Sequence, residues 1–294
     1  MDKTIIVSMY NKDHSIIKTI DQMFFPSLIR NASANIELII LNDCSPLEKE
    51  TQAMLDKYLP DLQNKFGKVR IVKNYTNLGF AKSYNKGISM AIGQQILIVN
   101  DDVYFTKGSI ARLFQVLNES PDYLIVGPIT NAGSVWSYQY CKQAPKLKDY
   151  SSTQFAKLEK FADWLKIRMN GKKINTDNLC GFCFVSHAKL LKEMGGFNES
   201  YKFGGYEDTD FIQKVVANYG QEKIIMALGI FIGHGGKDGT SRSFLQHPIK
   251  MMFNLTLNSF RYGKNWGYIK LIKRIAYGIF SQKTGKGTIS DLFS

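Results

Sequence analysis

The sequence is poor in cysteine and has no long hydrophobic run. It contains four cysteines in 294 residues, too few for the disulfide framework that is typical of small secreted domains. No run of about 18 uninterrupted apolar residues occurs, which is the length that a membrane-spanning helix needs. The first apolar run covers only residues 5–9. We therefore expect neither a secretion signal nor a membrane-spanning helix, and a protein that works in a reducing cytoplasm.

Two of the cysteines, Cys180 and Cys183, form a single C-x-x-C motif. A zinc site would need two further ligands at suitable spacing, and a redox motif would need thioredoxin-like surroundings. Neither accompanies this motif. We therefore predict that both cysteines are buried structural residues.

Glycine is missing where a dinucleotide site would need it. The first expected strand, residues 4–8, leads into Met9-Tyr10-Asn11-Lys12-Asp13, which has no glycine to let the backbone approach a pyrophosphate. A glycine-bearing turn comes only at residues 77–87, and it matches neither the dinucleotide fingerprint nor a P-loop. These features argue against a dehydrogenase. Lys82, near the start of the helix expected after this turn, either meets a diphosphate or is exposed to solvent.

Acidic residues are scarce near the carboxyl end of the chain. Residues 242–294 hold nine lysines and arginines against Asp291 alone, so they carry +8 of the formal net charge of +13. A nucleic-acid-binding protein would also be basic, but no recognition motif accompanies the charge. The acidic clusters described below would moreover repel phosphate in the absence of a metal. We expect no nucleic-acid partner for this chain.

Apolar runs of β-type residues alternate with helical patterns along the chain. Strands are expected at residues 4–8, 36–41, 70–73 and 96–99. Between them we expect a helix that follows Asn11 and ends near Pro26, and further helices at residues 47–58 and 80–92. This order predicts an α/β fold with a mostly parallel, doubly wound sheet.

The fourth of these strands ends in a cluster of polar residues. Residues 96–99 are continuously apolar, as in a central strand that is buried on both faces. Asn100, Asp101 and Asp102 follow directly, at the edge of an α/β sheet where ligands bind. Adjacent carboxylates repel each other unless a cation or hydrogen-bond donors share the site. The cluster is therefore either a divalent-metal site that holds nucleotide phosphates or a solvated turn.

Polar residues also follow the other three strands. Since the carboxyl ends of parallel strands meet at one edge of the sheet, we expect all these side chains to converge there, as in a nucleotide site. The residues are Ser8, Tyr10 and Asn11 after the first strand, Asn42 and Asp43 after the second, and Asn74 and Asn77 after the third.

Four motifs of the first half resemble those of the family-two nucleotide-sugar glycosyltransferases with the GT-A fold. They are Val7-Ser8-Met9-Tyr10-Asn11, Leu41-Asn42-Asp43-Cys44-Ser45, the run with Asn77, Gly79, Asn85 and Gly87, and Val99-Asn100-Asp101-Asp102-Val103. The resemblance runs from the start to about residue 240. It implies that Asp43 contacts the nucleotide base and that Asp102 serves the metal. Asn100 stands where the family's metal motif has its first aspartate.

The second half carries a more specific match. Gly195-Gly196-Phe197 and Gly204-Gly205-Tyr206-Glu207-Asp208 resemble the family's Gly-Gly-Phe and Glu-Asp motifs. The acids fall in the first turn of a helix expected to run to about Tyr219, where the helix dipole favours a carboxylate. Acids in a first turn also act as ordinary caps. The resemblance implies that Asp208 is the catalytic base, and that Glu207 and Asp210 orient the acceptor or brace the loop.

His234 follows an expected strand and stands among glycines. A single histidine at such a place is most often structural. In the family that the chain resembles, a histidine at this point can complete the metal site, so His234 is our second candidate metal ligand after Asp102.

The resemblance implies an inverting transfer of a sugar from a UDP or dTDP sugar to an acceptor hydroxyl, with Mn²⁺ or Mg²⁺ as cofactor, in bacterial surface-polysaccharide synthesis. The nucleotide-sugar-binding residues would be Ser8, Tyr10, Asn11, Asp43, Asn77, Gly79, Lys82, Asn100 and Asp101. A catalytically inactive sugar-nucleotide-binding or scaffold protein of the same fold is the alternative. Residues 1–103 would form the nucleotide-sugar half of a domain of residues 1–240, and residues 104–240 the acceptor half.

Aromatic residues are frequent between residues 130 and 177, and they either stack on sugar faces or belong to the core. They include Trp136, Tyr138, Tyr140 and Trp164. For Trp164, on an expected amphipathic helix at residues 155–169, we predict a core position.

Residues 241–294 are expected to form a basic amphipathic helical tail. Between residues 266 and 280 apolar side chains recur at helical spacing, and Lys270, Lys273 and Arg274 lie on the same turns. We expect the tail to hold the protein on the inner face of the cell membrane, at an anionic surface, where a glycan or lipid-linked glycan acceptor would be found. The alternative is a helical cap that packs on the catalytic domain.

Overall fold

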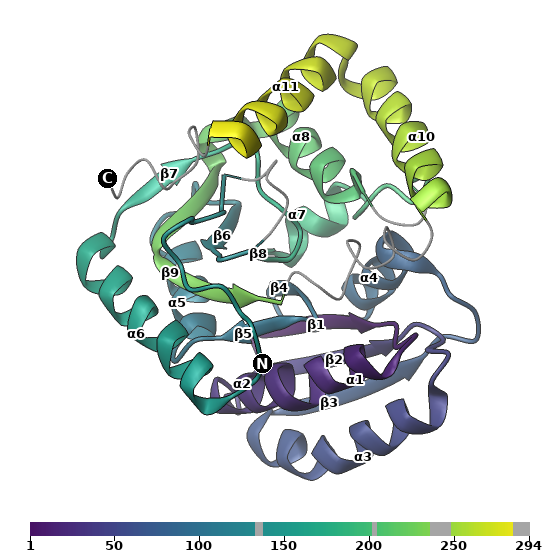
Figure 1. Ribbon diagram of the computed structural model, residues 1–294, viewed down its shortest axis with the longest axis vertical. Helices are drawn as coiled ribbons and strands as arrows, with labels where there is room; N and C mark the ends of the chain where they lie inside the picture. Colours follow the sequence, from purple (N-terminus) through teal and green to yellow (C-terminus); the bar gives the residue numbers. More distant parts are fainter. Residues whose placement is uncertain (133–137, 202–204, 236–247, 285–294) are drawn as a thin grey trace.

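The computed structural model describes residues 1–132, 138–201, 205–235 and 248–284, and a large sheet forms its centre (Figure 1). Nine strands of the described residues pair in the order β3-β2-β1-β4-β8-β6-β9-β5, with β7 paired to β9 outside this order. Helices cover both faces of the sheet. The predicted α/β class is therefore confirmed.

Four parallel strands make up the first half of the sheet. β1 lies between β2 and β4, and β2 pairs in turn with β3. The apolar side chains of β1, β2 and β4 are fully or almost fully buried because helices pack on both faces. The bounds are β1 (Lys3–Met9), β2 (Ile36–Asn42), β3 (Lys68–Lys73) and β4 (Gln95–Asn100). Their carboxyl ends meet at one edge, as the sequence predicted.

The second half of the sheet is mixed. β8 (Cys183–His187) runs antiparallel to both β4 and β6 (Ile125–Ile129). β9 (Ile224–His234) is parallel to β6 but antiparallel to β5 (Val103–Phe105) and β7 (Lys173–Asn175). The antiparallel pairing brings the start of β8 and the end of β9 to the carboxyl end of β4.

Three hydrophobic clusters hold the helices on the sheet. One joins the sheet to the helices of the amino-terminal segment, another joins it to α4 and α8, and a third joins β9 to α6. The first group comprises α1 (His14–Thr19), α2 (Phe25–Arg30), α3 (Glu48–Lys65) and α5 (Ser109–Leu117); the others are α4 (Gly79–Met90), α6 (Ser152–Met169), α7 (Ala188–Glu193), α8 (Glu207–Tyr219) and the short 3₁₀ helix η2 (Gln221–Lys223).

The first helical segment extends beyond its predicted end at Pro26. A π-helical segment, η1 (Ile20–Phe24), follows α1 directly and leads into α2, in which Pro26 stands in the first turn. Proline has no amide hydrogen and clashes with the carbonyl four residues earlier in a regular α-helix. The wider π turn just before Pro26 changes this register, so the helix continues to Arg30 and the prediction of its end was wrong.

Trp164 is not a core residue, contrary to the prediction. It is 41% exposed and stacks against Phe161 and Arg168 of its own helix, α6. The buried stripe of α6 runs instead through Leu158, Ala162, Leu165 and Met169. Trp164 lies next to this stripe, and helical spacing alone does not separate the two positions.

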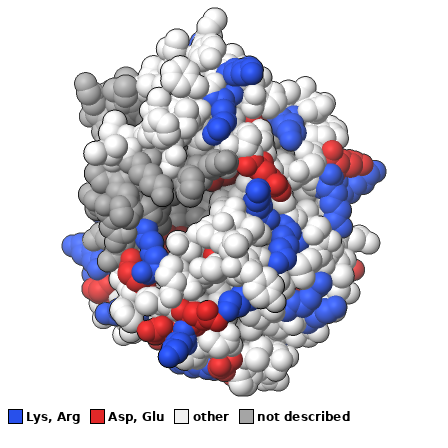
Figure 2. Space-filling model, turned by 90° about the vertical axis from the view of Figure 1, so that its right-hand side faces the viewer, with Lys and Arg blue, Asp and Glu red and all other residues white. Residues whose placement is uncertain are grey.

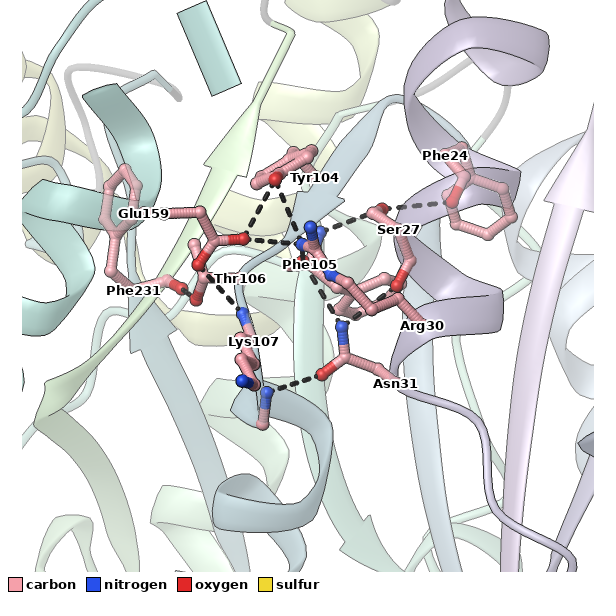
Figure 3. A network of polar contacts seen from close by, with 11 residues as sticks. Phe24, Ser27, Arg30, Asn31, Tyr104, Phe105, Thr106, Lys107, Glu159 and Phe231 are labelled. Atoms are coloured by element: carbon pink, nitrogen blue, oxygen red, sulfur yellow. Dashed lines mark hydrogen bonds and ion pairs between the residues drawn. The ribbon is translucent and has the colours of Figure 1, made fainter. Parts of the chain in front are cut away.

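A polar network ties α6 to α2 (Figure 3). The Arg30 guanidinium donates to the Tyr104 hydroxyl at 3.0 Å, to the Phe105 carbonyl at 2.8 Å and to Glu159 Oε1 at 2.5 Å. Glu159 Oε2 accepts from the Lys107 amide at 3.1 Å. The network joins α2 and α6 to β5 and to Lys107, just after β5, and we assign it to the stability of the fold.

The carboxyl-terminal segment is helical, as predicted, and forms a hairpin of α10 (Pro248–Trp266) and α11 (Tyr268–Thr284) around Gly267, which has a φ of 93°. The hairpin packs on the body through Tyr262 and Leu271, which meet Tyr201 in a small buried cluster. Among the described residues, no helix is long and apolar enough to cross a membrane.

Two of the three cations predicted to face a membrane contact the body. Lys270 Nζ donates to Gln213 Oε1 of α8 at 3.1 Å, and Arg274 donates to Asn178 and Thr209. Lys273 is exposed. Lys270 is exposed as well, whereas Arg274 is half-buried, so the basic side of α11 lies partly against α8 and its contact with a membrane stays a prediction.

Candidate active site

Asp102 and His234 meet at the carboxyl end of β4. β5 begins one residue after Asp102 and pairs with the end of β9, so Val103 lies opposite His234. Asp102 is buried, and its Oδ1 lies 3.0 Å from His234 Nε2. These two candidate metal ligands, 132 residues apart in the chain, are thus brought into direct contact.

The neighbours of His234 fix the orientation of its ring. Nδ1 lies 3.3 Å from the Ala132 carbonyl, and the His234 backbone amide donates to Asn131 Oδ1 at 2.8 Å. The imidazole stacks on Phe182, with ring centroids 5.0 Å apart. With Nδ1–H donating to the carbonyl, Nε2 faces Asp102; loss of the Nε2 proton would leave its lone pair for a cation, which is the arrangement that metal-ligating histidines commonly have.

Asp102 and His234 shift each other's pKa in the absence of a metal. Burial disfavours the ionised form of Asp102, but the charge and hydrogen bond of His234 outweigh it and lower the pKa of the carboxyl. Burial likewise opposes protonation of His234, yet Asp102 raises its pKa. The pair therefore favours an ion pair, which a cation bound between the two side chains would replace.

The donor set fits a divalent cation that also binds phosphate. Within the described ranges no group of three or more His, Cys, Asp or Glu side chains comes together, and these residues offer one carboxylate and one imidazole at this place. Mg²⁺ and Mn²⁺ sites in nucleotide enzymes typically use one or two protein ligands and fill the other positions with phosphate oxygens and water. Asp102 and His234 would be the two protein ligands.

Asp43 organises the turn between β3 and α4. Its carboxylate accepts hydrogen bonds of 2.9 Å from the Asn74 side chain and from the amides of Leu78 and Gly79. Gly79 has a φ of 76°, a left-handed conformation that favours glycine. Asp43 therefore shapes the edge of the site at residues 74–79, in addition to any contact with a nucleotide base.

The other predicted nucleotide-binding residues differ in accessibility. Asn11 is fully buried, and its side-chain amide donates to Thr51, so it lies behind the surface. Ser8 and Asn100 are half-buried where β1 and β4 end, and Asp101 follows at the same edge. Exposed positions are taken by Tyr10, Asn77 and Lys82. The strand ends thus present these side chains, apart from Asn11, along one edge.

Tyr84 connects the ends of β1 and β4, a role that the sequence did not indicate. The side chain is buried under both strands. Its hydroxyl donates to the Val99 carbonyl at 2.7 Å and accepts from the Ser8 amide at 3.4 Å. Burial raises the pKa of this phenol, so Tyr84 stays neutral and keeps the two strand ends together.

The acidic motif opens α8, as predicted, after a strained turn. Gly205 and Tyr206 both have a positive φ, of 106° and 76°. The two oxygens of Asp208 are held by different segments: Oδ2 accepts from the Gly181 amide at 2.7 Å, and Oδ1 from the Thr209 amide at 2.7 Å. A Cβ at position 181 would lie 2.7 Å from the Asp208 Cβ, so glycine is required for this approach.

Glu207 is the buried member of the acidic pair. Burial and the neighbouring Asp208 carboxylate raise the pKa of Glu207 to about 8. Its Oε2 has no hydrogen-bond partner among the described residues. Glu207 is therefore protonated near pH 7. Two neighbouring carboxyl groups whose surroundings separate their pKa values are suited to different roles in acid–base chemistry.

Asp210 has a bracing role. Its Oδ1 accepts from the Tyr201 hydroxyl at 3.0 Å, from the Trp266 indole at 2.7 Å and from the Asn265 amide at 3.3 Å. Asp210 is buried, so it fastens the end of α10 to α8 rather than facing an acceptor.

The segment before β8 joins the metal candidates to the acidic motif. Phe182 stacks on His234 and accepts the Asn100 amide through its carbonyl, while the adjacent Gly181 binds Asp208. Cys183 is buried as predicted, whereas Cys180, which lies beside Asp208, is half-buried. Figure 2 shows the face toward which β1 and β9 run, where acidic side chains gather at the edge of a hollow.

The fold and this edge of acidic residues define the chain as a GT-A protein, and comparisons with known proteins agree. Residues 4–195 match the profile of Glycosyl transferase family 2, so the chain belongs to this family. An uncharacterized glycosyltransferase of Haemophilus influenzae is 30% identical over 120 residues, which are 40% of this chain and 35% of that protein. The chain thus aligns with about a third of that relative's length.

Solved structures share the fold at low sequence identity. GalNAc-T7, crystallised with UDP, GalNAc and Mn²⁺, superposes with a TM-score of 0.56 and 16% identity over 80% of this chain and 44% of that chain. Residues 1–349 of S. aureus TarS superpose with a TM-score of 0.54 and 18% identity over 99% of this chain and 77% of that chain.

Proposed function

We propose that the chain is a metal-dependent, inverting glycosyltransferase that moves a sugar from a nucleotide diphosphate sugar to an acceptor hydroxyl. The observation that carries this proposal is the short connection between two chemically different centres. The Asp102–His234 pair suits a cation on a diphosphate. The Asp208 carboxylate accepts a hydrogen bond from Gly181, and the next residue, Phe182, stacks on His234.

Asp208 is the proposed catalytic base. Because the pKa of Glu207 is raised to about 8, Glu207 keeps its proton near pH 7 and the negative charge of the pair resides on Asp208. Amides of two different segments hold the carboxylate in one orientation. In this geometry Asp208 accepts the proton of the acceptor hydroxyl as that oxygen attacks the anomeric carbon. The neutral Glu207 is able to donate a hydrogen bond to the acceptor.

Asp102 and His234 are the proposed protein ligands of Mn²⁺ or Mg²⁺. When bound, the cation would neutralise charge on the leaving diphosphate. The chain itself contributes the orientation of both ligands, through the Ala132 carbonyl and the Phe182 ring. Asn100 and Asp101 lie at the adjoining strand end.

The proposed donor is a UDP or dTDP sugar, held along the edge formed by Ser8, Tyr10, Asp43, Asn77 and Gly79. Support comes from TarS, which has been crystallised with UDP-GlcNAc, and from GalNAc-T7 with UDP. We propose a glycan or lipid-linked glycan of the bacterial surface as the acceptor.

The function is tested with Asp208→Asn and Asp102→Ala, assayed for metal-dependent sugar transfer with a panel of nucleotide sugars. Asn keeps the size of Asp208 and one of its two hydrogen bonds from backbone amides but cannot accept a proton, so turnover should fall by about 10² to 10⁴ while calorimetry shows unchanged donor binding. Asp102→Ala should abolish the Mn²⁺ dependence of UDP binding. Asp122→Asn, at an exposed surface position, is the control. Near-normal turnover of Asp208→Asn would overturn the assignment of the base.

We also propose that the α10–α11 hairpin rests on an anionic membrane surface at the inner face of the cell membrane. The hairpin, residues 248–284, has seven lysines and arginines and no acidic residue. Its exposed large apolar side chains are Ile249, Met252, Phe253, Leu257, Phe260, Tyr268, Ile269 and Ile272. Those of α10 recur at helical spacing along one face. A basic helix with an exposed apolar stripe is typical of interfacial helices.

Sedimentation with phosphatidylglycerol vesicles at low and high salt tests the membrane proposal. A triple variant, Phe253→Ser, Leu257→Ser and Phe260→Ser, should no longer pellet, while Trp164→Ser with Ile167→Ser, which removes exposed apolar side chains of α6, should pellet like the wild type. Since all five residues are exposed, neither variant should lose much stability. Equal pelleting of the two variants would refute the stripe as the docking surface.

A further inference from the structure

The carboxyl-terminal hairpin reaches the candidate base through a single guanidinium. Arg274 of α11 donates from the same nitrogen to Asn178 Oδ1 at 2.9 Å and to Thr209 Oγ1 at 3.0 Å. Asn178 belongs to the segment that leads into β8, and Thr209 to the first turn of α8. Arg274 therefore links two segments that also meet where the Gly181 amide donates to Asp208.

These two segments are the ones that hold Asp208. The segment of Asn178 supplies the Gly181 amide to Asp208 Oδ2, and Thr209 supplies its amide to Asp208 Oδ1. The Thr209 hydroxyl, which accepts from Arg274, also lies 3.3 Å from Asp208 Oδ1. Each oxygen of the carboxylate is thus held by one of the two segments, and Arg274 adds a further link between these segments.

A second bridge runs parallel to the first, one helical turn earlier on α11. Lys270 donates to Gln213 Oε1 at 3.1 Å, and the Gln213 amide donates to the Asp177 carbonyl at 3.1 Å. Gln213 is buried. This bridge again joins α11, α8 and the segment before β8, so the contact of Arg274 is part of a continuous seam rather than an isolated surface pair.

We propose that Arg274 is a positioning residue for Asp208, and that α11 is thereby a functional part of the active site. The inference rests on the proposed role of Asp208 as the base. Without the guanidinium, Asn178 and Thr209 lose their common donor, and only the contacts of Asp208 with Gly181 and of Gln213 with Asp177 still hold the two segments together. Misplacement of a catalytic group by about 1 Å costs on the order of 10²-fold in rate, while the donor site at the ends of β1 to β4 is not touched.

Arg274→Met tests the proposal. Lys273→Met is the matched control, because Lys273 is exposed on the same helix and its replacement removes the same charge. The expected result for Arg274→Met is a kcat lower by about 10- to 100-fold, an unchanged KM for the donor and a slightly lower melting temperature, because the buried Asn178 and Thr209 side chains lose a donor. Arg274→Lys, which keeps a donor, should recover part of the loss. Thr209→Val combined with Arg274→Met should lose less than the sum of the two single effects, because both remove one contact.

Amide hydrogen exchange provides a measurement that does not depend on activity. Exchange should rise in residues 176–182 and 207–211 of Arg274→Met and stay at the wild-type rate in Lys273→Met. If Asp208→Asn is inactive and Arg274→Met has wild-type kcat and exchange, the positioning role is refuted while the proposed function stands. If Asp208→Asn is fully active, the proposed function itself fails. Equal losses in Arg274→Met and Lys273→Met would assign the effect to general charge.

Discussion

Replacing Glu207 with glutamine should remove most of the decrease in the free energy of unfolding that the wild type shows between pH 5 and pH 8. Burial and the Asp208 carboxylate raise the pKa of Glu207 from the ordinary 4.5 to about 8 in the folded protein. In the unfolded chain both influences vanish and the carboxyl titrates at its ordinary value. Between these two pKa values the folded protein holds one proton more than the unfolded chain at this position.

The free energy of unfolding therefore falls as pH rises through this window. One bound proton corresponds to a slope of about 1.4 kcal/mol per pH unit. The stabilisation is fully present below pH 4.5 and is lost as pH approaches 8, a total of about 5 kcal/mol. Glutamine has nearly the same volume and does not titrate, so Glu207→Gln lacks this slope and should be more stable than the wild type at pH 8.

Urea unfolding at half-unit steps from pH 5 to pH 8 measures the effect. Glu222→Gln, at an exposed position, is the control and should keep the wild-type slope. Asp208→Asn should reduce the slope in part, because it removes the neighbouring charge that raises the pKa of Glu207. A Glu207→Gln curve parallel to the wild-type curve would show that Glu207 is ionised in the folded protein at neutral pH, and the assignment of the negative charge to Asp208 alone would fall.

Three other substitutions report on separate parts of the site. Tyr84→Phe should lower the free energy of unfolding by about 1–2 kcal/mol in urea, because it leaves the buried Val99 carbonyl without its 2.7 Å donor; an unchanged midpoint would contradict this. Gly181→Ala should lower kcat by about 10² with intact donor binding by calorimetry, since its Cβ would lie 2.7 Å from that of Asp208; wild-type kcat would show that the segment moves freely. Asp43→Ala should raise the KM for the nucleotide sugar about tenfold or more, at nearly constant kcat, because the turn at residues 74–79 loses three hydrogen bonds; an unchanged KM would remove this turn from the donor site.

Local chemistry was sufficient to predict much of the frame. The apolar run of residues 96–99 became the buried strand β4, and the acids at residues 207–210 opened α8, which ends at Tyr219 as expected. Strand periodicity and helix-start signals act over a few residues, so they are visible in the sequence. The same local signals misplaced the end of the first helix, because the π turn before Pro26 has no signature of its own.

Side-chain direction was less accessible to the sequence. Asn11 lies in the first-strand motif, yet it points toward Thr51 and away from the edge. Trp164 lies beside the buried stripe of α6 rather than within it. For Asn11 the rotamer, and for Trp164 the position on the helix, decides whether the side chain is buried or exposed. Residues distant in the chain determine both.

The sequence by itself determined which residue types stand at the strand ends and in the first turn of α8, because strand, helix and turn preferences are properties of short segments. Only the tertiary structure decided which of them meet. His234 reaches Asp102 because β5 pairs with β9, Asp208 is held because a glycine before β8 allows close approach, and Arg274 links the two segments that hold Asp208 because the hairpin folds back on α8. Contacts of this kind depend on strand pairing and helix packing between segments far apart in the chain, which no local pattern encodes.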